Sequence, residues 1–312
     1  MSSRTENSAE TKVKIPRQGF VTDGRRRWVT EVAGEEVQFR RLDWRDINEL
    51  NQIVELQDQV WQMGDKNLVP ENLLAIVEEV GGDVLSAGKP GSAPDGFVLT
   101  VPTANPERLF LHMVGVNPES QSRGLGEKLM LLEGTLARDR GIKRIDWTYD
   151  PLMGANANLY LAHLGTVPHK YTINKYGILV NSTDPNIEPR YKKVETDRFT
   201  VRWDIGNDGL WQKIMSGENF TADLSGESEW NGEGAVPDRF RVSLPRDFAS
   251  MTREGMIDTR NYLRQIALRA MSYEDISNRG SVEGTHEVTG FGSDPDSNAN
   301  YYVFESRQDL VK

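Results

Sequence analysis

One segment in the middle of the chain restricts the fold more than any other. Residues 109–116 read as a strand, 126–140 carry leucines along one helical face, 144–149 read as a second strand, and 155–163 as a short helix. Two strands joined through a helix in this way lie parallel in one sheet, because a parallel pair needs a long crossover connection. The sequence therefore predicts a mixed α/β (α+β) fold with a central sheet flanked by helices.

Further elements are predicted on both sides of this unit. Before it, the patterns indicate a strand, two helices and a strand, over 37–42, 46–61, 70–80 and 96–101. The last of these strands is expected to form a hairpin with the strand that opens the central unit. After the unit, the patterns indicate three strands and one helix, over 239–244, 286–291, 301–304 and within 247–271.

These patterns divide the chain into three parts. Residues 1–34 are polar and predict an N-terminal arm, in which the run Arg25-Arg26-Arg27 is a solvated tail or a strap across a neighbouring surface. Residues 35–180 predict the main domain, and 181–312 predict a smaller C-terminal α/β domain. Within that smaller domain, 206–234 are rich in Gly, Ser, Glu and Asp and predict a long, flexible surface loop.

Composition excludes several classes of function. The chain has no cysteine, which removes disulfides, zinc–thiolate sites and every cysteine nucleophile. Its four histidines lack the i, i+4 spacing of a helical metal pair, so no metal is expected. A formal charge of -10 argues against a nucleic-acid partner. No apolar run approaches the ~18 residues of a membrane span, and no secretory signal is visible, so no membrane association and a cytoplasmic location are expected.

A glycine-rich loop joins the strand at 109–116 to the helix at 126–140. It reads Gln121-Ser122-Arg123-Gly124-Leu125-Gly126. Glycines let backbone N–H groups approach an anion, the helix N-terminus supplies free donors and a favourable dipole, and Arg123 adds positive charge. The spacing matches neither a Walker loop nor a dinucleotide fingerprint. The loop predicts a pyrophosphate-binding site; the alternative is a helix start that uses glycine only for close packing.

The pattern Gln/Arg-x-x-Gly-x-Gly/Ala between a strand and a long helix resembles motif A of the GCN5-related N-acetyltransferase (GNAT) superfamily. Other phrases are similar to a bacterial GNAT subfamily with an additional C-terminal domain, namely those at 75–87, 112–116, 147–152, 156–157, 164–165 and 171–177. The resemblance covers roughly residues 35–180, and 190–305 look like the C-terminal half of the same subfamily.

This resemblance implies acetyl-CoA or another acyl-CoA as the donor. Backbone amides from Gln121 to Gly126 would hold the pyrophosphate, and backbone groups of Val114 and Val116 would pair with the pantetheine arm like an added strand. Asn156 would face the pantetheine.

Transfer of an acyl group from a thioester needs a deprotonated nucleophile, donors for the oxyanion and an acid for the leaving thiolate. Since the chain has no cysteine and no Gly-x-Ser-x-Gly motif, direct attack in a ternary complex is expected. His112 is the first candidate base, because it lies in the strand before the loop and an ordinary histidine titrates near ~6.5. A hydrogen-bonded structural histidine is the alternative.

Two further residues complete the candidate set. Asp150, before Pro151 at a strand end, is a candidate base or an ordinary turn residue. The general-acid tyrosine of the superfamily lies four residues before a glycine of motif B. Here that position is Leu161, and Tyr160 is one residue away, which turns a helical side chain by ~100°. Tyr160 is therefore a candidate acid in a doubtful register, or a core aromatic.

Taken together, the sequence predicts an acyl-CoA-dependent acyltransferase that acts on a small-molecule acceptor. The acidic C-terminal part favours a cationic or amine acceptor by electrostatic steering. Two alternatives stay open, a non-catalytic acyl-CoA-binding module and a thioester hydrolase or decarboxylase on the same fold. The oligomeric state, a homodimer included, also stays open.

Overall fold

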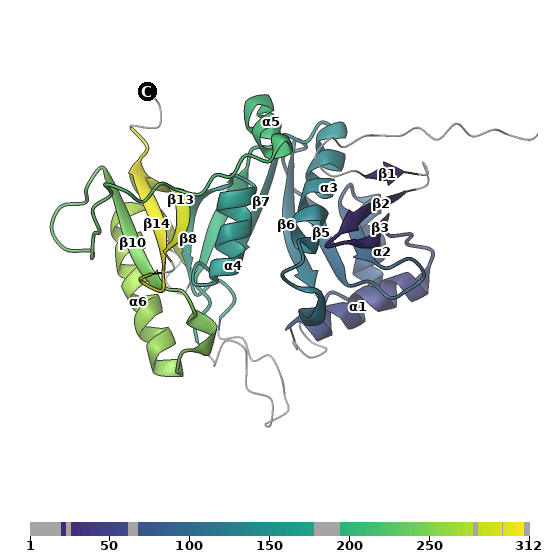
Figure 1. Ribbon diagram of the computed structural model, residues 1–312, viewed down its shortest axis with the longest axis horizontal. Helices are drawn as coiled ribbons and strands as arrows, with labels where there is room; N and C mark the ends of the chain where they lie inside the picture. Colours follow the sequence, from purple (N-terminus) through teal and green to yellow (C-terminus); the bar gives the residue numbers. More distant parts are fainter. Residues whose placement is uncertain are drawn as a thin grey trace, which may run out of the picture. The chain divides into compact units, whose positions relative to one another are not determined.

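The computed structural model describes residues 20–22, 26–61, 68–177, 194–276, 280–294 and 296–308. They form two compact units (Figure 1). The first holds Leu111–Arg140 and the described residues of Met1–Val60 and Asn67–Pro102. The second holds Thr103–Phe110, Trp61 and the described residues of Gly141–Lys312. Strand β6 contributes residues to both.

The first unit is built on an antiparallel sheet in chain order. Its strands are β1 (Val21–Thr22), β2 (Arg27–Val32), β3 (Glu35–Arg41), β4 (Asp83–Gly88) and β5 (Gly96–Pro102), each paired with the next. The order continues from β5 to β6 (Arg108–Val116). The helices are α1 (Ile47–Trp61), α2 (Glu71–Glu79) and α3 (Leu125–Asp139), and a 3-10 turn spans Pro118–Ser120. Strands β5 and β6 are neighbours in this sheet, as the predicted hairpin requires.

Helix α3 packs against β4 and β5 through the leucine face that the sequence predicts. Leu125, Leu129 and Leu132 are at most 5% exposed, and each contributes ~1.5–3 kcal/mol of burial. Gly96 allows the close approach of the helix, since a Cβ there would lie 3.0 Å from a Leu129 methyl and 3.2 Å from a Leu125 methyl.

One buried acid interrupts this apolar face. Glu133 of α3 is fully buried and accepts a hydrogen bond of 2.9 Å from the Thr100 hydroxyl. Burial, followed by the nearby charge of Asp83, raises the pKa of Glu133 to about 8. Its other oxygen has no hydrogen-bond partner among the described residues. Glu133 is therefore protonated over most of the range below pH 8.

Part of the expected N-terminal arm belongs to the sheet. Residues 27–32 form β2, where Trp28, Thr30 and Val32 are buried in alternation. Arg26 donates to the Leu42 carbonyl and to Glu78, both at 2.6 Å. Because apolar and polar residues alternate in this stretch, it can pair with β3 as a strand with one buried face. Its high charge alone indicates a solvated segment. Residues 1–19 and Arg25 lie outside the described residues.

The second unit contains two sheets. One has the strand order β6, β7 (Arg144–Tyr149), β9 (Arg198–Trp203), β8 (Val167–Ile173), β11 (Ser272–Asp275) and β12 (Gly280–Val282). The other has the order β10 (Arg239–Pro245), β14 (Ala299–Ser306) and β13 (His286–Asp294). Helix α6 (Arg253–Ala270) packs against β8, β10 and β11, and a 3-10 turn at Phe248–Ser250 precedes it. The predicted strands and helix after residue 238 are all present.

The predicted crossover is confirmed, since β6 and β7 pair in parallel over three residue pairs, from Arg108 with Arg144 to Phe110 with Asp146. The mixed α/β class is thereby confirmed. The predicted loop at 206–234 differs from the structure, because helix α5 (Asp208–Ser216) lies within it. Asn207 caps that helix by accepting from the Leu210 N–H, and Ile214 is buried, so a cap and one buried apolar side chain offset the polar composition.

Candidate functional site

The glycine-rich loop lies in the first unit, at the end of β6. Asn117 caps the turn Pro118–Ser120 by accepting from the Glu119 N–H at 3.1 Å, and its own N–H donates to the Asp95 carbonyl at 2.7 Å. The Gln121 amide donates to the Val116 carbonyl at 2.9 Å. These bonds tie the loop back to the strands, so its conformation is set before any ligand binds.

The loop turns into α3 through Gly124, which has φ of +86° and stands at the N-cap. Most side chains disfavour that conformation, and a Cβ on Gly124 would meet no atom within 4 Å. Ser122 also has a positive φ of 62°. The space beside the Gly124 backbone is therefore open.

Backbone donors and charge gather at the same place. The first helical hydrogen bond of α3 runs from the Lys128 N–H to the Gly124 carbonyl. The backbone N–H groups of the residues between them come before this bond, where a helix has no carbonyl of its own to offer them. Residues 121–124 are exposed. Arg123 lies 3.8 Å from Glu35, both about half exposed, and such a pair holds a side chain only weakly. Arg123 can therefore turn toward a phosphate.

Strand β6 presents the other donor-binding candidates. Leu109, Leu111 and Gly115 are buried on one face, and His112, Val114 and Val116 alternate onto the other. Val114 and Val116 lie beyond the last residue of β6 that pairs with β7. Their backbone is where the sequence predicts the pantetheine.

His112 has an exposed side chain, and the described residues give its ring no hydrogen bond or ion pair. Partial desolvation lowers the pKa of His112 from its usual value near 6.5. The ring is therefore mostly neutral at pH 7, as an acceptor of a proton must be.

The second unit holds the remaining candidates, and Asp150 is the most constrained of them. Its side chain is 2% exposed and forms ion pairs with two arginines. Arg260 donates hydrogen bonds of 2.8 and 3.3 Å, and a nitrogen of Arg198 lies 3.3 Å from Oδ2 without a hydrogen bond. Its Oδ1 also accepts from the Leu152 N–H at 3.0 Å. Burial raises the pKa of Asp150, but the two arginine charges outweigh it and hold the pKa below its usual value.

A carboxylate held in this way is a weak base, since both oxygens are occupied and its proton affinity is reduced. Of the two roles open for Asp150, the arrangement disfavours the base. It favours an anchoring role for the end of β7, tying this strand to α6. The sequence did not indicate Arg198 or Arg260 as partners. The one available signal was an arginine at position 260 inside the apolar stripe of a helix, between Met256 and Leu263.

Tyr160 lies in a part of the chain that winds differently from the expected helix. After α4 (Gly154–Ala157), residues Asn158–His163 form a π-helical turn, and the Leu164 N–H donates to the Leu159 carbonyl, five residues back. Gly165 follows the end of this turn, with φ of +61°. A hydrogen bond to the fifth residue back spans one residue more than that of an α-helix, which is the size of the offset of Tyr160 in the sequence.

The environment of Tyr160 is aromatic. Its ring is 5% exposed and meets the rings of Trp147 and Tyr149 edge-on, with centroids 5.1 and 5.3 Å away. Thr166 holds its backbone carbonyl with two hydrogen bonds of 3.0 Å. Asn156, on α4, is half-buried, and no hydrogen bond of its side chain is formed with the described residues.

The candidates thus fall into two groups. The first unit holds His112, Val114, Val116 and the loop 121–126. The second unit holds Asp150, Asn156 and Tyr160. In the described part of the chain, no three His, Asp or Glu residues gather as metal ligands would. No helix among the described residues is long and apolar enough to cross a membrane.

Part of the chain matches the model of a known family. The model of the Acetyltransferase (GNAT) family matches residues 50–165, a range that contains every candidate residue. A comparison with curated protein sequences finds no match.

Solved structures similar to this chain include three acetyltransferase-related proteins. IAA acetyltransferase from Bacillus cereus is 16% identical, with a TM-score of 0.40, over 54% of this chain and 99% of its own. The ribosomal-protein-S18-alanine N-acetyltransferase from Escherichia coli is 14% identical, with a TM-score of 0.41, over 61% and 97%. The yncA protein from Salmonella typhimurium, solved with acetyl-CoA, is 16% identical, with a TM-score of 0.40, over 55% and 95%. The part of this chain that matches the Acetyltransferase (GNAT) family is thus residues 50–165.

Proposed function

We propose that the protein transfers an acyl group from acyl-CoA, with acetyl-CoA as the first candidate, to the amine of a small molecule. The observation that carries this proposal is the exposed loop at the start of α3, where Gly124 has φ of +86° and leaves the backbone donors open. A helix N-terminus with Arg123 beside it suits a pyrophosphate.

The donor would lie along the first unit. The amides from Gln121 to Gly126 bind the pyrophosphate, and the β6 backbone at Val114 and Val116 accepts the pantetheine as an added strand. Asn156, in the second unit, has a side-chain amide with no hydrogen-bond partner among the described residues. The long contact along backbone groups positions the thioester without a covalent link to the protein.

His112 serves as the base in this proposal. The amine nitrogen attacks the thioester carbonyl, the new C–N bond forms, and the amine proton passes to the neutral imidazole. Tyr160 serves as the acid, because the C–S bond then breaks and its hydroxyl proton neutralises the thiolate. Asp150 takes no proton and anchors the end of β7 through Arg198 and Arg260.

The π turn also bears on the alternatives. The non-catalytic alternative depends on the offset of Tyr160 from the usual acid position, and the wider winding of the turn at Asn158–His163 weighs against that alternative. A hydrolase or a decarboxylase differs from a transferase only in the group that attacks the thioester or leaves it. An assay therefore has to distinguish the three reactions.

The test measures free thiol released from acetyl-CoA and from longer acyl-CoAs, with and without a panel of amines. We expect thiol only when an amine is present, together with the mass of an N-acylated product. Thiol without amine indicates a hydrolase, and a lighter CoA ester indicates a decarboxylase. CoA binding without turnover on any amine would favour the non-catalytic module.

A further inference from the structure

The turn that follows β8 presents a lysine beside an aromatic ring. Residues Asn174 to Gly177 form this turn, which a hydrogen bond of 3.2 Å closes from the Gly177 N–H to the Asn174 carbonyl. Asn174 has a positive φ of 46°, which is uncommon for residues other than glycine. Lys175 is the second residue of the turn, and its Nζ lies 5.7 Å from the centroid of the Tyr176 ring. All of these residues belong to the second unit.

Hydrogen bonds to a distant part of the chain hold the turn in place. The Lys175 N–H donates to the Thr196 carbonyl at 3.0 Å, and the Tyr176 N–H donates to the Thr196 hydroxyl at 2.9 Å. That hydroxyl donates in turn to the Gly177 carbonyl at 2.8 Å. The backbone on both sides of the lysine side chain is therefore fixed.

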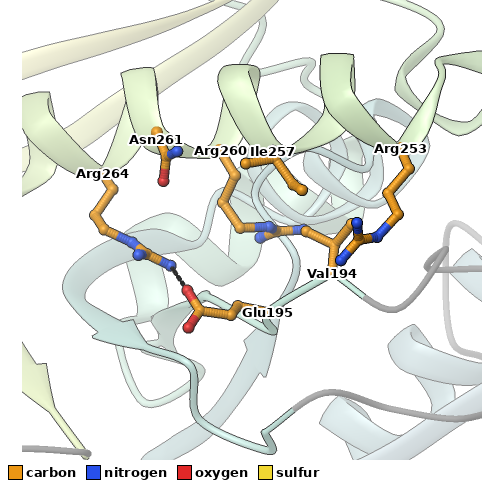
Figure 2. A pocket seen from close by; sticks show the side chains of 7 residues that line it. All are labelled: Val194, Glu195, Arg253, Ile257, Arg260, Asn261 and Arg264. Atoms are coloured by element: carbon orange, nitrogen blue, oxygen red, sulfur yellow. Dashed lines mark hydrogen bonds and ion pairs between the residues drawn. The ribbon is translucent and has the colours of Figure 1, made fainter.

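The segment that holds the turn is itself anchored. Asp197 accepts from the Asn174 N–H at 2.9 Å, from the Tyr171 hydroxyl at 2.6 Å, and from Arg264 at 2.7 and 2.8 Å. Figure 2 shows Arg264 extending from α6 toward Glu195, to which it donates at 2.6 Å. Carboxylates in this region are thus bound to groups other than Lys175.

The ammonium group of Lys175 has cations around it. Within the described part of the chain it forms no hydrogen bond or ion pair, and the side chain is half-buried. Burial, followed by the charge of Lys170 on β8, lowers the pKa of Lys175, and Arg198 on β9 acts in the same direction. Glu274 on β11 acts against them, but Lys170 binds this carboxylate at 2.9 Å. The guanidinium of Arg198 lies 5.5 Å from the Tyr176 ring, so two cations meet at this ring.

An amine in these surroundings is a nucleophile near neutral pH. Only the neutral form of a lysine attacks a carbonyl, and desolvation and a neighbouring cation both favour that form. Solvent reaches Lys175, so an imine formed with an aldehyde or ketone would hydrolyse, whereas an amide persists in water. Acylation also removes the positive charge that burial and the neighbouring cations disfavour. These points favour an acyl donor as the reagent.

We propose that Lys175 is an acylation site, at which the side-chain amine reacts directly with an acyl thioester from solution. The nitrogen attacks the thioester carbonyl, the C–N bond forms and the C–S bond breaks. The thiolate leaves, the nitrogen gives its proton to water, and an uncharged amide remains on the side chain. This reaction takes place on the second unit alone and does not rest on the proposed function.

The test measures the initial acetylation rate of individual lysines by peptide mass spectrometry, in the full chain incubated with acetyl-CoA. The control lysines are Lys89 and Lys213, whose side chains are 56% and 57% exposed and lie 3.1 Å from Glu35 and Glu218. At pH 7.5 we expect Lys175 to react at least threefold faster than either control. The advantage should shrink toward pH 10, because lysines in general lose their proton there. A rate no faster than that of the controls, or an advantage that does not change with pH, overturns the proposal.

A variant tests the part played by the neighbouring charges. Lys170→Gln removes one cation and frees Glu274, so the Lys175 rate should fall at least threefold at pH 7.5 and change little at pH 10. The ion pair of Lys170 is exposed and contributes little to stability, so the variant should fold, which circular dichroism checks. The matched control, Lys213→Gln, should leave the rate within twofold. An unchanged rate in the folded Lys170→Gln variant overturns the proposal.

A second reagent separates this reaction from the proposed function. A short acetyl thioester that lacks the nucleotide of CoA has no pyrophosphate for the loop 121–126 to bind. We expect Lys175 to keep its advantage over Lys89 and Lys213 with this reagent. An advantage seen only with acetyl-CoA would mean that bound CoA delivers the acyl group, and would overturn the direct reaction. The amine-dependent thiol release that tests the proposed function is unaffected by either result.

Discussion

Replacing Gly124 by alanine tests the pyrophosphate site directly, and the chain offers a matched control. Gly124 stands at the N-terminal end of α3 with φ of +86°, and Gly141 follows its C-terminal end with φ of +87°. At both positions a Cβ would meet no atom within 4 Å. The two substitutions therefore introduce the same backbone strain and no collision within the protein.

The expected magnitudes follow from this symmetry. A left-handed backbone costs an alanine ~1–2 kcal/mol, so both variants should unfold at similarly reduced temperatures. Only Gly124→Ala places a methyl group where the loop backbone must approach a phosphate. We expect its dissociation constant for CoA to rise about tenfold or more, or ~1.4 kcal/mol, while Gly141→Ala binds CoA as the unmodified protein does.

The assay is calorimetric titration of CoA into the three proteins, with thermal unfolding of each as the measure of strain. The reasoning would be refuted if Gly124→Ala and Gly141→Ala, both folded, bound CoA with affinities within twofold of each other. The loop would then be only a tightly packed helix start.

Three other substitutions test the chemistry and the core. His112→Gln should preserve CoA affinity and lower kcat/KM for the amine by ~10²–10⁴; because the pKa of His112 is lowered, the rate that depends on it should fall as pH drops through a value below 6.5. Tyr160→Phe should lower kcat by ~10² at unchanged CoA affinity. The control is Tyr149→Phe, which removes a hydroxyl that meets the Tyr302 hydroxyl and should change kcat little. Equal rates in the two variants would remove Tyr160 as the acid. Glu133 has a raised pKa of about 8, so the folded state holds its proton more tightly than the unfolded state does, and stability should decline as pH rises from about 4.5 to about 8. In Glu133→Gln that decline, measured by denaturant titration at several pH values, should be smaller, and an unchanged slope would contradict the burial argument.

The central crossover of β6, α3 and β7 could be predicted because its signals are local. Strand β6, helix α3 and strand β7 follow one another within about forty residues, and their alternation and leucine spacing are visible in the chain. The glycine-rich loop is likewise contiguous, so its residues are neighbours whatever the rest of the chain does. The structure adds that Gly124 has a positive φ and that the loop is held by Asn117 and Gln121.

The strand β2 and the helix α5 were less accessible to prediction. Both lie in stretches whose overall composition is polar, and each is held by only a few buried side chains, such as Trp28 in the strand and Ile214 in the helix. The overall composition of a stretch hides the effect of such single residues. Strand β2 forms because it pairs with β3, and helix α5 forms because it is capped and buries Ile214.

The sequence by itself determines which functional groups are present and the order of the helices and strands that carry them. It determines that no thiol is present, that glycines precede α3 and that His112 lies in β6. These are properties of residues close together in the chain, where the backbone geometry of a strand or a helix sets the spacing.

What only the tertiary structure decides is the state of each group. Asp150 is an ion-paired carboxylate because Arg260, 110 positions away, and Arg198 reach it when the second unit folds. Tyr160 lies in a π turn, and not in the α-helix that its sequence predicts, because the chain winds more widely over Asn158–His163. Burial and long-range charge set proton affinity, and packing sets helical winding, and neither is encoded in the spacing of neighbouring residues.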